Sequence, residues 1–472
     1  MAFYDNWPQW DPKLVLALLM IIVVVGHVWE LILTKRQQLV CLNAVIVPEE
    51  LRGIIPPDLF HRARIYELHK MELLSWKIAV DLVLSLAELF FGFYPFVWGL
   101  AAKTLARATH KEIWISPLFV FYMTIYTCVR FLPVLAYDKC ILELRYGVQR
   151  QFSCFLYCCI AVVAIILTQI ILAPITLLIV FTVTMAGYWF FLYYWGAWAV
   201  FTLLLVFLFP YCCILCIGRQ QRLPEGTPLY ADIKRVCDVA GFPVKRVFII
   251  RTKTMQYSNA YFYGSCCIKR IVLFDTLLLN KGLDPKELQP YEVGRGLTNQ
   301  QVAGVVCHEL GHWKYGHFCK TTVLMKLHFL LTMLLFGVFF HCPQLYMGVG
   351  FAPGTMPIIV GFIIVLRFAL TPYLTLANFL ILWIMRHNEF SADRYAHRLG
   401  YSTQLSSALV KIYADHMSFP VFDDCYSRWH HTHPTILQRL AYQRRLDMQA
   451  AAKMLDSVKA KPIGKTQASD SG

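Results

Sequence analysis

The segment Cys307–Trp313 contains two histidines four residues apart, with a glutamate directly after the first. On a helix, His308 and His312 lie on one face, so both imidazoles can reach a single metal ion. Glu309 lies about 100° around the helix from His308, next to an open coordination position. Zinc accepts imidazole nitrogen and suits three protein ligands with one position left for water. The spacing therefore predicts a catalytic zinc site in which Glu309 handles the proton of a water molecule.

The residues before His308 predict that this segment is helical. Thr298 and Gln301 have the spacing of a capping box, in which each side chain caps the backbone N–H of the other residue. Apolar residues at helical spacing follow, which places His308 in the third turn. An amphipathic helix whose histidines only face water is the alternative. That interpretation leaves the acidic cluster later in the chain unexplained.

This later cluster contains Glu389 and Asp393, which share one helical face. A zinc site with two histidines needs a third ligand, often a carboxylate from a later helix, and a further acid that orients an imidazole. Glu389 fits the ligand and Asp393 fits the orienting acid. The alternative is a solvated acidic face beside Arg386 and Arg394. The histidine pair upstream favours the metal site.

The composition is that of a protein with several membrane spans. Of 472 residues, 58% are hydrophobic and only 15% are charged, and the mean hydropathy is +0.52. Apolar segments near the ~20 residues needed to cross a bilayer predict seven spans, at about 14–34, 74–99, 115–137, 153–183, 188–217, 322–341 and 356–385. Six spans are the alternative, because Ala186–Gly187 is the only break between the fourth and fifth.

The predicted spans divide the chain into membrane and polar parts. These parts are 1–217 with spans one to five, 218–321 with the histidine motif, 322–385 with spans six and seven, 386–450 with the acidic cluster, and a polar tail, 451–472, that we expect to be disordered. His27 and Glu30 lie in the first span, and no small-residue cleavage site follows it. We therefore expect a retained anchor and not a removed signal peptide.

Lysine and arginine residues set the predicted orientation. They are frequent after the first span, in 218–321 and beyond 385, and absent from the connections between spans four and five and between spans six and seven. Placing the basic side in the cytosol puts the zinc motifs there and the amino terminus on the opposite face. The net charge of +15 then faces an anionic leaflet, so we expect no nucleic acid as a partner.

The 16 cysteines contain no facing C-x-x-C pairs, and we expect buried thiols instead of disulfides.

Charged residues lie within several predicted spans. Lys77, Asp81 and Glu88 form one stripe on the second span, and each charge at membrane depth costs at least ~2.5 kcal/mol. Further cations in the spans are Arg130, Lys326 and Arg367. One interpretation is pairing, with Lys77 and Asp81 as a candidate pair within the helix. The other is a hydrated chamber that the spans enclose, and the spacing does not distinguish the two.

Four segments, taken in order, resemble those of a known family. They are Ser258–Gly264, His308–Trp313, Asn388–Phe390 with Ala392–Asp393, and Trp429–Pro434 with Arg439–Leu440. With predicted spans at the matching intervals, the chain from the first span to Arg445 resembles the type I CAAX prenyl proteases, which are integral-membrane zinc metalloproteases. Ser391 and Arg394 depart from the residues expected beside the acidic motif and leave the ligands unchanged.

The resemblance implies a fold and an activity. It implies seven membrane helices that form a barrel around a hydrated chamber, with a cytosol-facing, gluzincin-like zinc domain that carries a small β-sheet. Members of the family lie in the endoplasmic reticulum membrane and, in animals, the inner nuclear membrane. They bind one Zn²⁺ and cleave farnesylated or geranylgeranylated CAAX proteins, releasing the last three residues; some make a second, upstream cut. We expect a monomer in the lipid bilayer, with the zinc site facing the cytosol or nucleoplasm. The tail carries no retrieval signal, so residence in the reticulum rests on the spans or on this analogy.

The resemblance also implies roles for individual residues. His308, His312 and Glu389 match the zinc ligands, and Glu309 matches the general base. Arg439 lies in the last matching segment and is a further candidate for the site.

A histidine-rich loop is a second candidate for the site. His433 matches the family histidine that approaches the zinc and stabilises the oxyanion. His430 and His431 crowd the same loop, so the sequence does not show which of the three faces the metal. From the residues alone, structural packing explains this loop somewhat better than a role at the metal.

A substrate-binding strand is also implied. Asn259, Ala260, Tyr261 and Phe262 match an edge strand that pairs with the substrate backbone. The flanking segments 247–250 and 271–274 predict strands from their own composition. A peptide added to such an edge gains main-chain hydrogen bonds without sequence specificity. Without the resemblance, we would interpret Asn259 as a turn residue.

Three other functions fit parts of the sequence. A site-2-type intramembrane protease has the same histidine motif, but its partner is an aspartate in a later span. A transporter or channel explains the charged stripe but not the glutamate within the histidine pair. A quality-control or translocon-clearing factor fits as a broader or an added role, because the three ligands and the base are all present.

Overall fold

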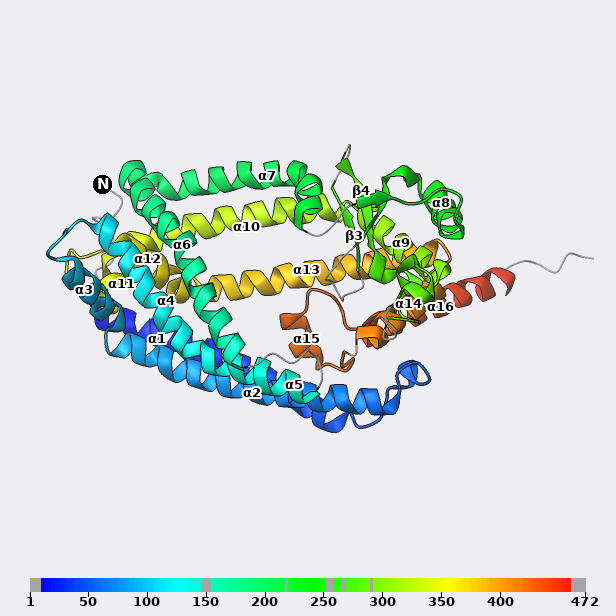
Figure 1. Cartoon of the computed structure of the whole chain (residues 1–472), viewed down its shortest axis with the longest axis horizontal. Helices are drawn as coiled ribbons and strands as arrows, with labels where there is room; N and C mark the ends of the chain where they lie inside the picture. Colours follow the sequence, from blue (N-terminus) through cyan, green and yellow to red (C-terminus); the bar gives the residue numbers. More distant parts are fainter. Residues whose placement is uncertain are drawn as a thin grey trace, which may run out of the picture.

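The computed structural model describes residues 10–146, 154–216, 220–251, 259–264, 268–288, 292–416 and 418–459. Ser258, the first residue of the segment that resembles the family, lies outside them. Long helices run along the longest axis of the molecule, and a small sheet and shorter helices gather at one end (Figure 1). The prediction of a mainly helical fold with a small β-sheet is confirmed.

The helices of the membrane part are α1 (Pro12–Asn43), α2 (Pro57–Phe90), α3 (Phe93–Leu105), α4 (Glu112–Tyr137), α5 (Glu143–Tyr146), α6 (Cys154–Ala186), α7 (Phe190–Cys216), α10 (His317–Phe340), α11 (Pro343–Gly348), α12 (Ile358–Ile364) and α13 (Thr371–Arg398). The polar end holds α8 (Pro228–Ala240), α9 (Asn299–Lys314), α14 (Ser402–His416), α15 (Asp424–His430) and α16 (Ile436–Lys459). The tail predicted to be disordered from 451 is therefore helical as far as Lys459. Alanine, lysine, methionine and leucine, all strong helix formers, extend α16 there.

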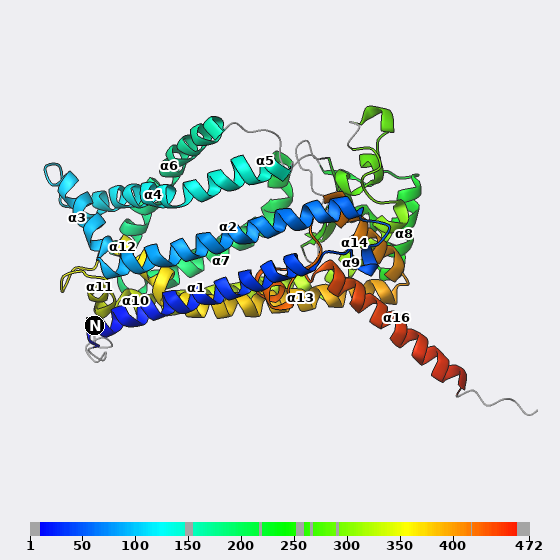
Figure 2. The same ribbon diagram turned by 90° about the horizontal axis from the view of Figure 1, so that it is seen from below.

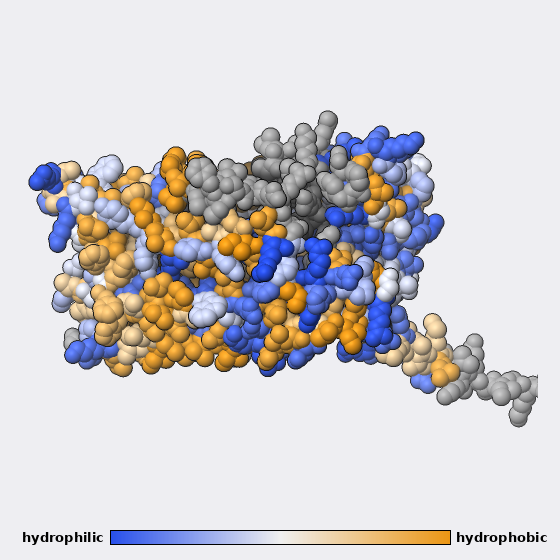
Figure 3. Space-filling view, turned by 60° about the horizontal axis from the view of Figure 1, so that its bottom comes forward, coloured by the Kyte–Doolittle hydropathy of each residue, from blue (hydrophilic) through white to orange (hydrophobic). Residues whose placement is uncertain are grey.

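Four helical stretches of the described residues are long and apolar enough to cross a bilayer, or six if each of two bent helix pairs is one span. One stretch, Val162–Leu208, includes most of α6 and α7. The 3-10 turn Gly187–Trp189 separates these two helices. The count of seven spans remains a prediction, which depends on α6 and α7 crossing separately. Apolar side chains cover much of the helical part in Figure 3, and hydrophilic ones gather at the end with the sheet.

Two predicted spans are not continuous helices. The predicted span 74–99 includes the end of α2 and the start of α3, which are bent by 65°. Gly92 lies at this bend with φ +62°, a left-handed conformation that glycine adopts without steric cost. The predicted span 356–385 includes α12, the π-helical turn Val365–Ala369 and the first half of α13, with a bend of 59° between the two helices. Apolar length alone indicates neither bend.

A buried ionic cluster joins the two bends. Arg130 on α4 forms salt bridges with Asp81 and Glu88 on α2. Arg367, in the turn between α12 and α13, binds Glu88 at 2.7 Å, and His27 on α1 contacts Asp81 at 3.1 Å. The charges of this cluster are therefore paired between helices, as expected for charges held away from water.

The suggested pairing of Lys77 with Asp81 is wrong. Asp81 instead binds Arg130 and His27, and the Lys77 ammonium lies 5.4 Å from the centre of the Phe131 ring. A partner on a neighbouring helix brings a guanidinium fork to Asp81, which suits a carboxylate better than an ammonium four residues away. The hydrated chamber remains a prediction.

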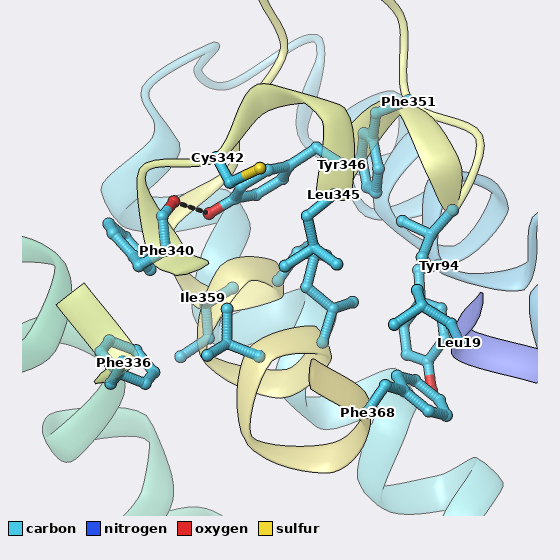
Figure 4. Close-up of a cluster of buried hydrophobic side chains, with 14 of the residues drawn as sticks. Leu19, Tyr94, Phe336, Phe340, Cys342, Leu345, Tyr346, Phe351, Ile359 and Phe368 are labelled. Atoms are coloured by element: carbon cyan, nitrogen blue, oxygen red, sulfur yellow. Dashed lines mark hydrogen bonds between the residues drawn. The ribbon is translucent and has the colours of Figure 1, made fainter. Parts of the chain in front are cut away.

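Aromatic side chains form the core at the end of the molecule remote from the sheet (Figure 4). The Tyr346 hydroxyl donates a hydrogen bond to the carbonyl of Phe340 at 3.0 Å (Figure 4). A Cβ atom at Gly361 would lie 2.0 Å from that hydroxyl. Glycine therefore lets α12 pack directly against α11, which secures one end of the α12–α13 pair.

The sheet has the order β1-β2-β4-β3, with β1 (Gln220–Arg222), β2 (Val247–Ile250), β3 (Ala260–Tyr263) and β4 (Arg270–Phe274). β2 and β4 are parallel, and β3 pairs with β4 in antiparallel fashion. The strands predicted at 247–250 and 271–274 are confirmed as β2 and β4. β3 is the last strand at one edge of the described sheet, beside α9 (Figure 1).

Candidate metal centre

Helix α9 begins with the predicted capping box. The Thr298 side chain accepts a hydrogen bond from the backbone N–H of Gln301, and the Gln301 side chain accepts one from the backbone N–H of Thr298. This pair satisfies two donors that the first helical turn leaves unbonded. The third turn of α9 then brings His308, Glu309 and His312 to the interior of the polar end, with His308 and Glu309 buried.

Close packing of α9 against α13 brings the two halves of the centre together. A Cβ atom at Gly311 would lie 2.8 Å from the Cα of Ala392. Only glycine permits this approach, because any side chain would separate the two backbones. Gly311 lies on α9 beside His312, and Ala392 lies on α13 beside Asp393. The glycine therefore determines the distance between the histidines and the acidic cluster.

Three side chains converge at this contact. Among the described residues, His308, His312 and Glu389 form the group that could hold a metal ion, with one donor atom of each within 4.8 Å of the others. The Nε2 atoms of the histidines are 3.1 Å apart, and Glu389 oxygens lie 3.5 Å from His308 and 3.4 Å from His312. Two imidazole nitrogens and one carboxylate oxygen form the donor set of a catalytic zinc site. The residues present therefore fit a zinc ion with one open position.

Asp393 and Arg439 hold the first imidazole. Asp393 Oδ1 lies 2.8 Å from His308 Nδ1, and Arg439 binds both oxygens of Asp393, at 2.5 and 2.9 Å. Burial and Arg439 lower the pKa of His308, but the carboxylates of Asp393 and Glu389 outweigh them and raise it to about 9 in the metal-free centre. Burial likewise opposes the charge of Arg439, yet Asp393 holds the pKa of that guanidinium above its ordinary value. His308 therefore directs Nε2 to the metal position and Nδ1–H to Asp393.

A chain of hydrogen bonds holds the second imidazole. His312 Nδ1 lies 2.9 Å from Nδ1 of His317, whose Nε2 lies 3.0 Å from the Ser391 hydroxyl. That hydroxyl donates to the Asn388 carbonyl at 2.8 Å. Since a carbonyl only accepts, the proton positions follow along the chain: His317 Nε2–H donates to Ser391, and His312 Nδ1–H donates to His317. This tautomer leaves Nε2 of His312 free for the metal.

Glu309 connects the centre to the edge strand. Its Oε2 accepts a hydrogen bond from the backbone N–H of Phe262 on β3 at 2.8 Å. Asn259 precedes β3, and its carbonyl accepts a hydrogen bond from the backbone N–H of Phe274 on β4 at 3.0 Å. Asn259 thus extends the strand pairing, and the interpretation of it as a turn residue is not needed. The structure brings Asn259, Ala260, Tyr261 and Phe262 to one strand beside the proposed base.

The structure distinguishes the three histidines at the end of α15 and in the loop that follows it. His433 Nδ1 lies 3.0 Å from Glu389 Oε2, and its side chain is 64% exposed. His430 instead contacts Glu30 of α1 at 3.3 Å. Burial, with Arg386 nearby, lowers the pKa of His431 to about 4. Of the three, His433 is therefore the histidine that contacts Glu389, a candidate metal ligand.

Arg386 holds this loop in place. Its Nη1 donates to the carbonyl of His433 at 2.9 Å and to that of Ser427 at 3.2 Å. Its Nη2 donates to Gln438 at 2.6 Å. Arg386 lies one turn before Glu389 on α13, so one helix carries the third ligand candidate and the anchor of the His433 loop.

Comparison with known proteins gives the family. The model of the CAAX prenyl protease N-terminal region, with five membrane helices, matches residues 36–217, and that of peptidase family M48 matches residues 226–446. The CAAX prenyl protease 1 homolog of Homo sapiens is 32% identical over 439 residues, which cover 88% of this chain and 92% of that protein. The chain belongs to the CAAX prenyl protease 1 family. The homolog of Caenorhabditis elegans is 29% identical over 430 residues, with 88% of this chain and 94% of that protein covered.

A solved structure supports the same family. The crystal structure of S. mikatae Ste24p matches with a TM-score of 0.71 and 26% sequence identity, covering 93% of this chain and 100% of that one. The resemblance and the mainly helical membrane fold with a small sheet, both inferred from the sequence, are thus confirmed. As a member of peptidase family M48, the protein is a multi-pass membrane metalloendopeptidase.

Sequence reasoning missed three residues of this CAAX prenyl protease centre. His317 follows the histidine motif at no familiar ligand spacing, and Ser391 was noted only as a departure from the family. The partners of both are visible only in three dimensions. Arg386 had one signal: it lies three residues before Glu389, on the helical face that also carries Asp393.

Proposed function

We propose that this protein is a zinc-dependent endopeptidase that removes the last three residues of prenylated CAAX proteins. The observation that carries the proposal is the meeting of His308, His312 and Glu389 next to Glu309, whose carboxylate binds the edge strand. The relatives are CAAX prenyl proteases by name, which supports this substrate class. One zinc ion per chain fits the single group of three donors in the described residues.

The donor set supports zinc over other metals. His308, His312 and Glu389 would hold the ion, and Asp393 orients His308 from behind. When bound there, zinc lowers the pKa of a water molecule to ~7 and polarises the scissile carbonyl. Calcium and magnesium prefer all-oxygen sites, so the paired imidazoles disfavour them.

Glu309 is the general base in this proposal. One carboxylate oxygen holds the Phe262 N–H, which directs the other oxygen to the water position. Glu309 takes the proton of the attacking water and passes it to the leaving amine. General acid–base catalysis of this kind contributes about 10²- to 10⁴-fold to the rate.

The substrate backbone lies along β3 in this proposal. An extended peptide paired with the outer edge of Asn259–Phe262 places its scissile bond between Glu309 and the metal position. His433, which is exposed and 3.0 Å from Glu389, donates a hydrogen bond to the oxyanion that develops at the scissile carbonyl. Arg439 supports the centre through Asp393.

The membrane part supplies the environment for the prenyl chain. Each buried methylene of such a chain contributes ~0.8 kcal/mol to binding, so lipid contact supplies much of the substrate affinity.

We propose a hydrated chamber within the spans, a location in the endoplasmic reticulum membrane or the inner nuclear membrane, and a zinc site on the cytosolic or nucleoplasmic face. The basic loops support this orientation. We further propose that the protein acts as a monomer.

A proteoliposome assay tests this function. Purified protein is reconstituted and given a farnesylated CAAX peptide, with release of the C-terminal tripeptide followed by mass spectrometry. We expect cleavage that stops with a zinc chelator and returns when zinc is added. The same peptide without the farnesyl group should be cleaved far more slowly.

Two results would contradict the proposal. One is equal cleavage with and without chelator, in protein shown to be free of metal. The other is cleavage by Glu309→Gln protein at the wild-type rate. Cleavage of unprenylated membrane proteins at the rate of the farnesylated peptide would favour the broader quality-control role.

A further inference from the structure

A basic cleft lies between the end of α13 and the middle of α16, away from the proposed peptidase chemistry. Its volume is about 500 Å³, within the ~300–1,000 Å³ of small-molecule sites. The residues that line it include Arg394, His397, Arg398, Tyr442, Arg445 and Lys453. Figure 2 shows α16 leaving the body of the molecule at this end. One wall of the cleft therefore belongs to the core of the polar end, and the other belongs to a projecting helix.

Four permanent cations in this cleft have no carboxylate partner among the described residues. Arg394 donates to the Tyr442 hydroxyl at 2.8 Å, and Arg398 donates to the Tyr315 hydroxyl at 3.0 Å. Phenols are neutral, so they orient the two guanidinium groups and leave both charges uncompensated. Arg445 and Lys453 are exposed on α16. The nearby carboxylate of Asp447 faces His397, at 3.1 Å.

The arrangement concentrates like charges instead of separating them. Arg394 and Arg398 are four residues apart on α13, a spacing at which like charges destabilise a helix. The negative end of the α13 dipole offsets part of this cost. It does not explain why α16 presents Arg445 and Lys453 to the same space. An anion between the two helices would neutralise both sets.

We propose that this cleft binds a multiply phosphorylated anion, supplied either as a free organic phosphate or as the headgroup of a phosphorylated lipid. Arginine forks match phosphate oxygens in pairs and form charge-assisted hydrogen bonds. Two orienting phenols already hold the guanidinium groups, which lowers the entropy lost on binding. This site is independent of the proposed CAAX activity, because none of its lining residues belongs to the metal centre.

The cleft is nevertheless connected to the metal centre through its two helices. Asp393, which orients His308, directly precedes Arg394, and its backbone carbonyl accepts a hydrogen bond from Gln443 of α16 at 3.2 Å. Arg439 of α16 binds the Asp393 carboxylate. An anion bridging α13 and α16 therefore reinforces the contact that holds the first histidine, so its binding slows the release of zinc.

Isothermal titration of the zinc-loaded, full-length protein in an uncharged detergent at physiological salt tests the proposal. One probe is inositol hexakisphosphate, and the other is a short-chain phosphatidylinositol bisphosphate. The test variant is Arg445→Gln with Lys453→Gln, since both side chains lie on the surface of α16 and form no ion pair with a carboxylate in the described part of the chain. The matched control removes two other cations, Arg428→Gln and Arg444→Gln, which bind Asp424 and Glu50 outside the cleft.

We expect saturable binding of at least one probe to the wild-type protein. The affinity of the test variant should be at least about tenfold weaker, a loss of ~1.4 kcal/mol. The affinity of the control variant should stay within about twofold of wild type. Tighter binding of the lipid identifies the bilayer as the source, and tighter binding of the free phosphate identifies a solute. No saturable binding of either probe, or an equal loss in the control variant, would overturn the site. Zinc release to a chelator at an unchanged rate, with the ligand saturating, would overturn its coupling to the metal centre.

Discussion

Replacing His317 with phenylalanine tests whether a hydrogen-bond chain, and not only the three ligands, determines zinc affinity. Phenylalanine keeps the size and planarity of the ring and removes the nitrogen that accepts from His312 Nδ1 at 2.9 Å. His312 must keep its proton on Nδ1 when Nε2 binds metal. The substitution therefore leaves this N–H without its partner in the metal-bound state.

The size of the effect follows from the geometry. An unsatisfied, partly buried N–H costs about 1–3 kcal/mol. In the metal-free protein, the ring can rotate or change tautomer, so this cost falls mainly on the zinc-bound state. The zinc dissociation constant should rise about 10- to 100-fold, the range typical for the loss of a group that orients a ligand. Ser391→Ala, which removes only the outer link to His317, should cost about 0.5–1.5 kcal/mol.

Competition with a chromogenic chelator measures the zinc dissociation constant of purified protein directly, without reference to turnover. The matched control is His328→Phe. His328 lies on the same helix, α10, and binds the hydroxyl of Tyr373 at 2.9 Å instead of a ligand of the metal centre. Thermal unfolding of each variant shows whether a loss of affinity reflects the centre or the fold.

The expected order of zinc affinity is wild type, then Ser391→Ala, then His317→Phe, with the His328 variant equal to wild type. Zinc affinity within twofold of wild type for a well-folded His317→Phe protein would refute the reasoning. An equal loss in the His328 variant would do the same, because the effect would then belong to α10 as a whole.

Three further predictions concern the same centre. Glu309→Gln should keep its zinc, by elemental analysis, and lose about 10²- to 10⁴-fold in turnover; wild-type turnover would remove Glu309 from the role of base. Gly311→Ala places a Cβ 2.8 Å from the Cα of Ala392, so we expect overpacking to cost about 1–3 kcal/mol, with a lower melting temperature and weaker zinc binding. An unchanged melting temperature and zinc affinity would show that α13 moves away from α9 without cost. In the metal-free protein, the pKa of His308 is raised to about 9. Protonation of His308 therefore stabilises the fold fully below pH ~6.5, the ordinary pKa of histidine. This stabilisation is lost as the pH rises through about 9. The melting temperature of chelator-treated protein should therefore fall between pH 6.5 and 9, and calorimetry in buffers of different ionisation enthalpy should show proton release on zinc binding near pH 7.5; the absence of both would contradict the assignment.

The local patterns of the chain determined the parts of this protein that depend on short-range physics. Helical spacing placed His308 and His312 on one face, and the capping box at Thr298 predicted the start of α9. The acidic spacing of Glu389 and Asp393 predicted a ligand with an orienting partner, and strand composition indicated β2 and β4. Each of these features involves residues within a turn or two of each other, so one periodicity suffices to predict it.

The charges of the membrane part show where such patterns stop. The sequence predicted that charges such as Asp81, Glu88, Arg130 and Arg367 face protein or water, because lipid does not solvate a charge, and it left pairing and a hydrated chamber open. It suggested Lys77 for Asp81 from their spacing, whereas the tertiary structure pairs Asp81 with Arg130 and His27. Spacing along one helix gives no information about which neighbouring helix approaches.

Sequence by itself therefore determined the metal-binding chemistry, the membrane character and the family of this protein. Only the tertiary structure decided that His317 and Ser391 complete the support of His312, that His433 and not His430 contacts Glu389, and that two spans are bent. The physical reason is that these contacts join residues on different helices and loops. Their distances depend on how closely two backbones can pack, which at Gly311 is decided by the space that one missing Cβ leaves.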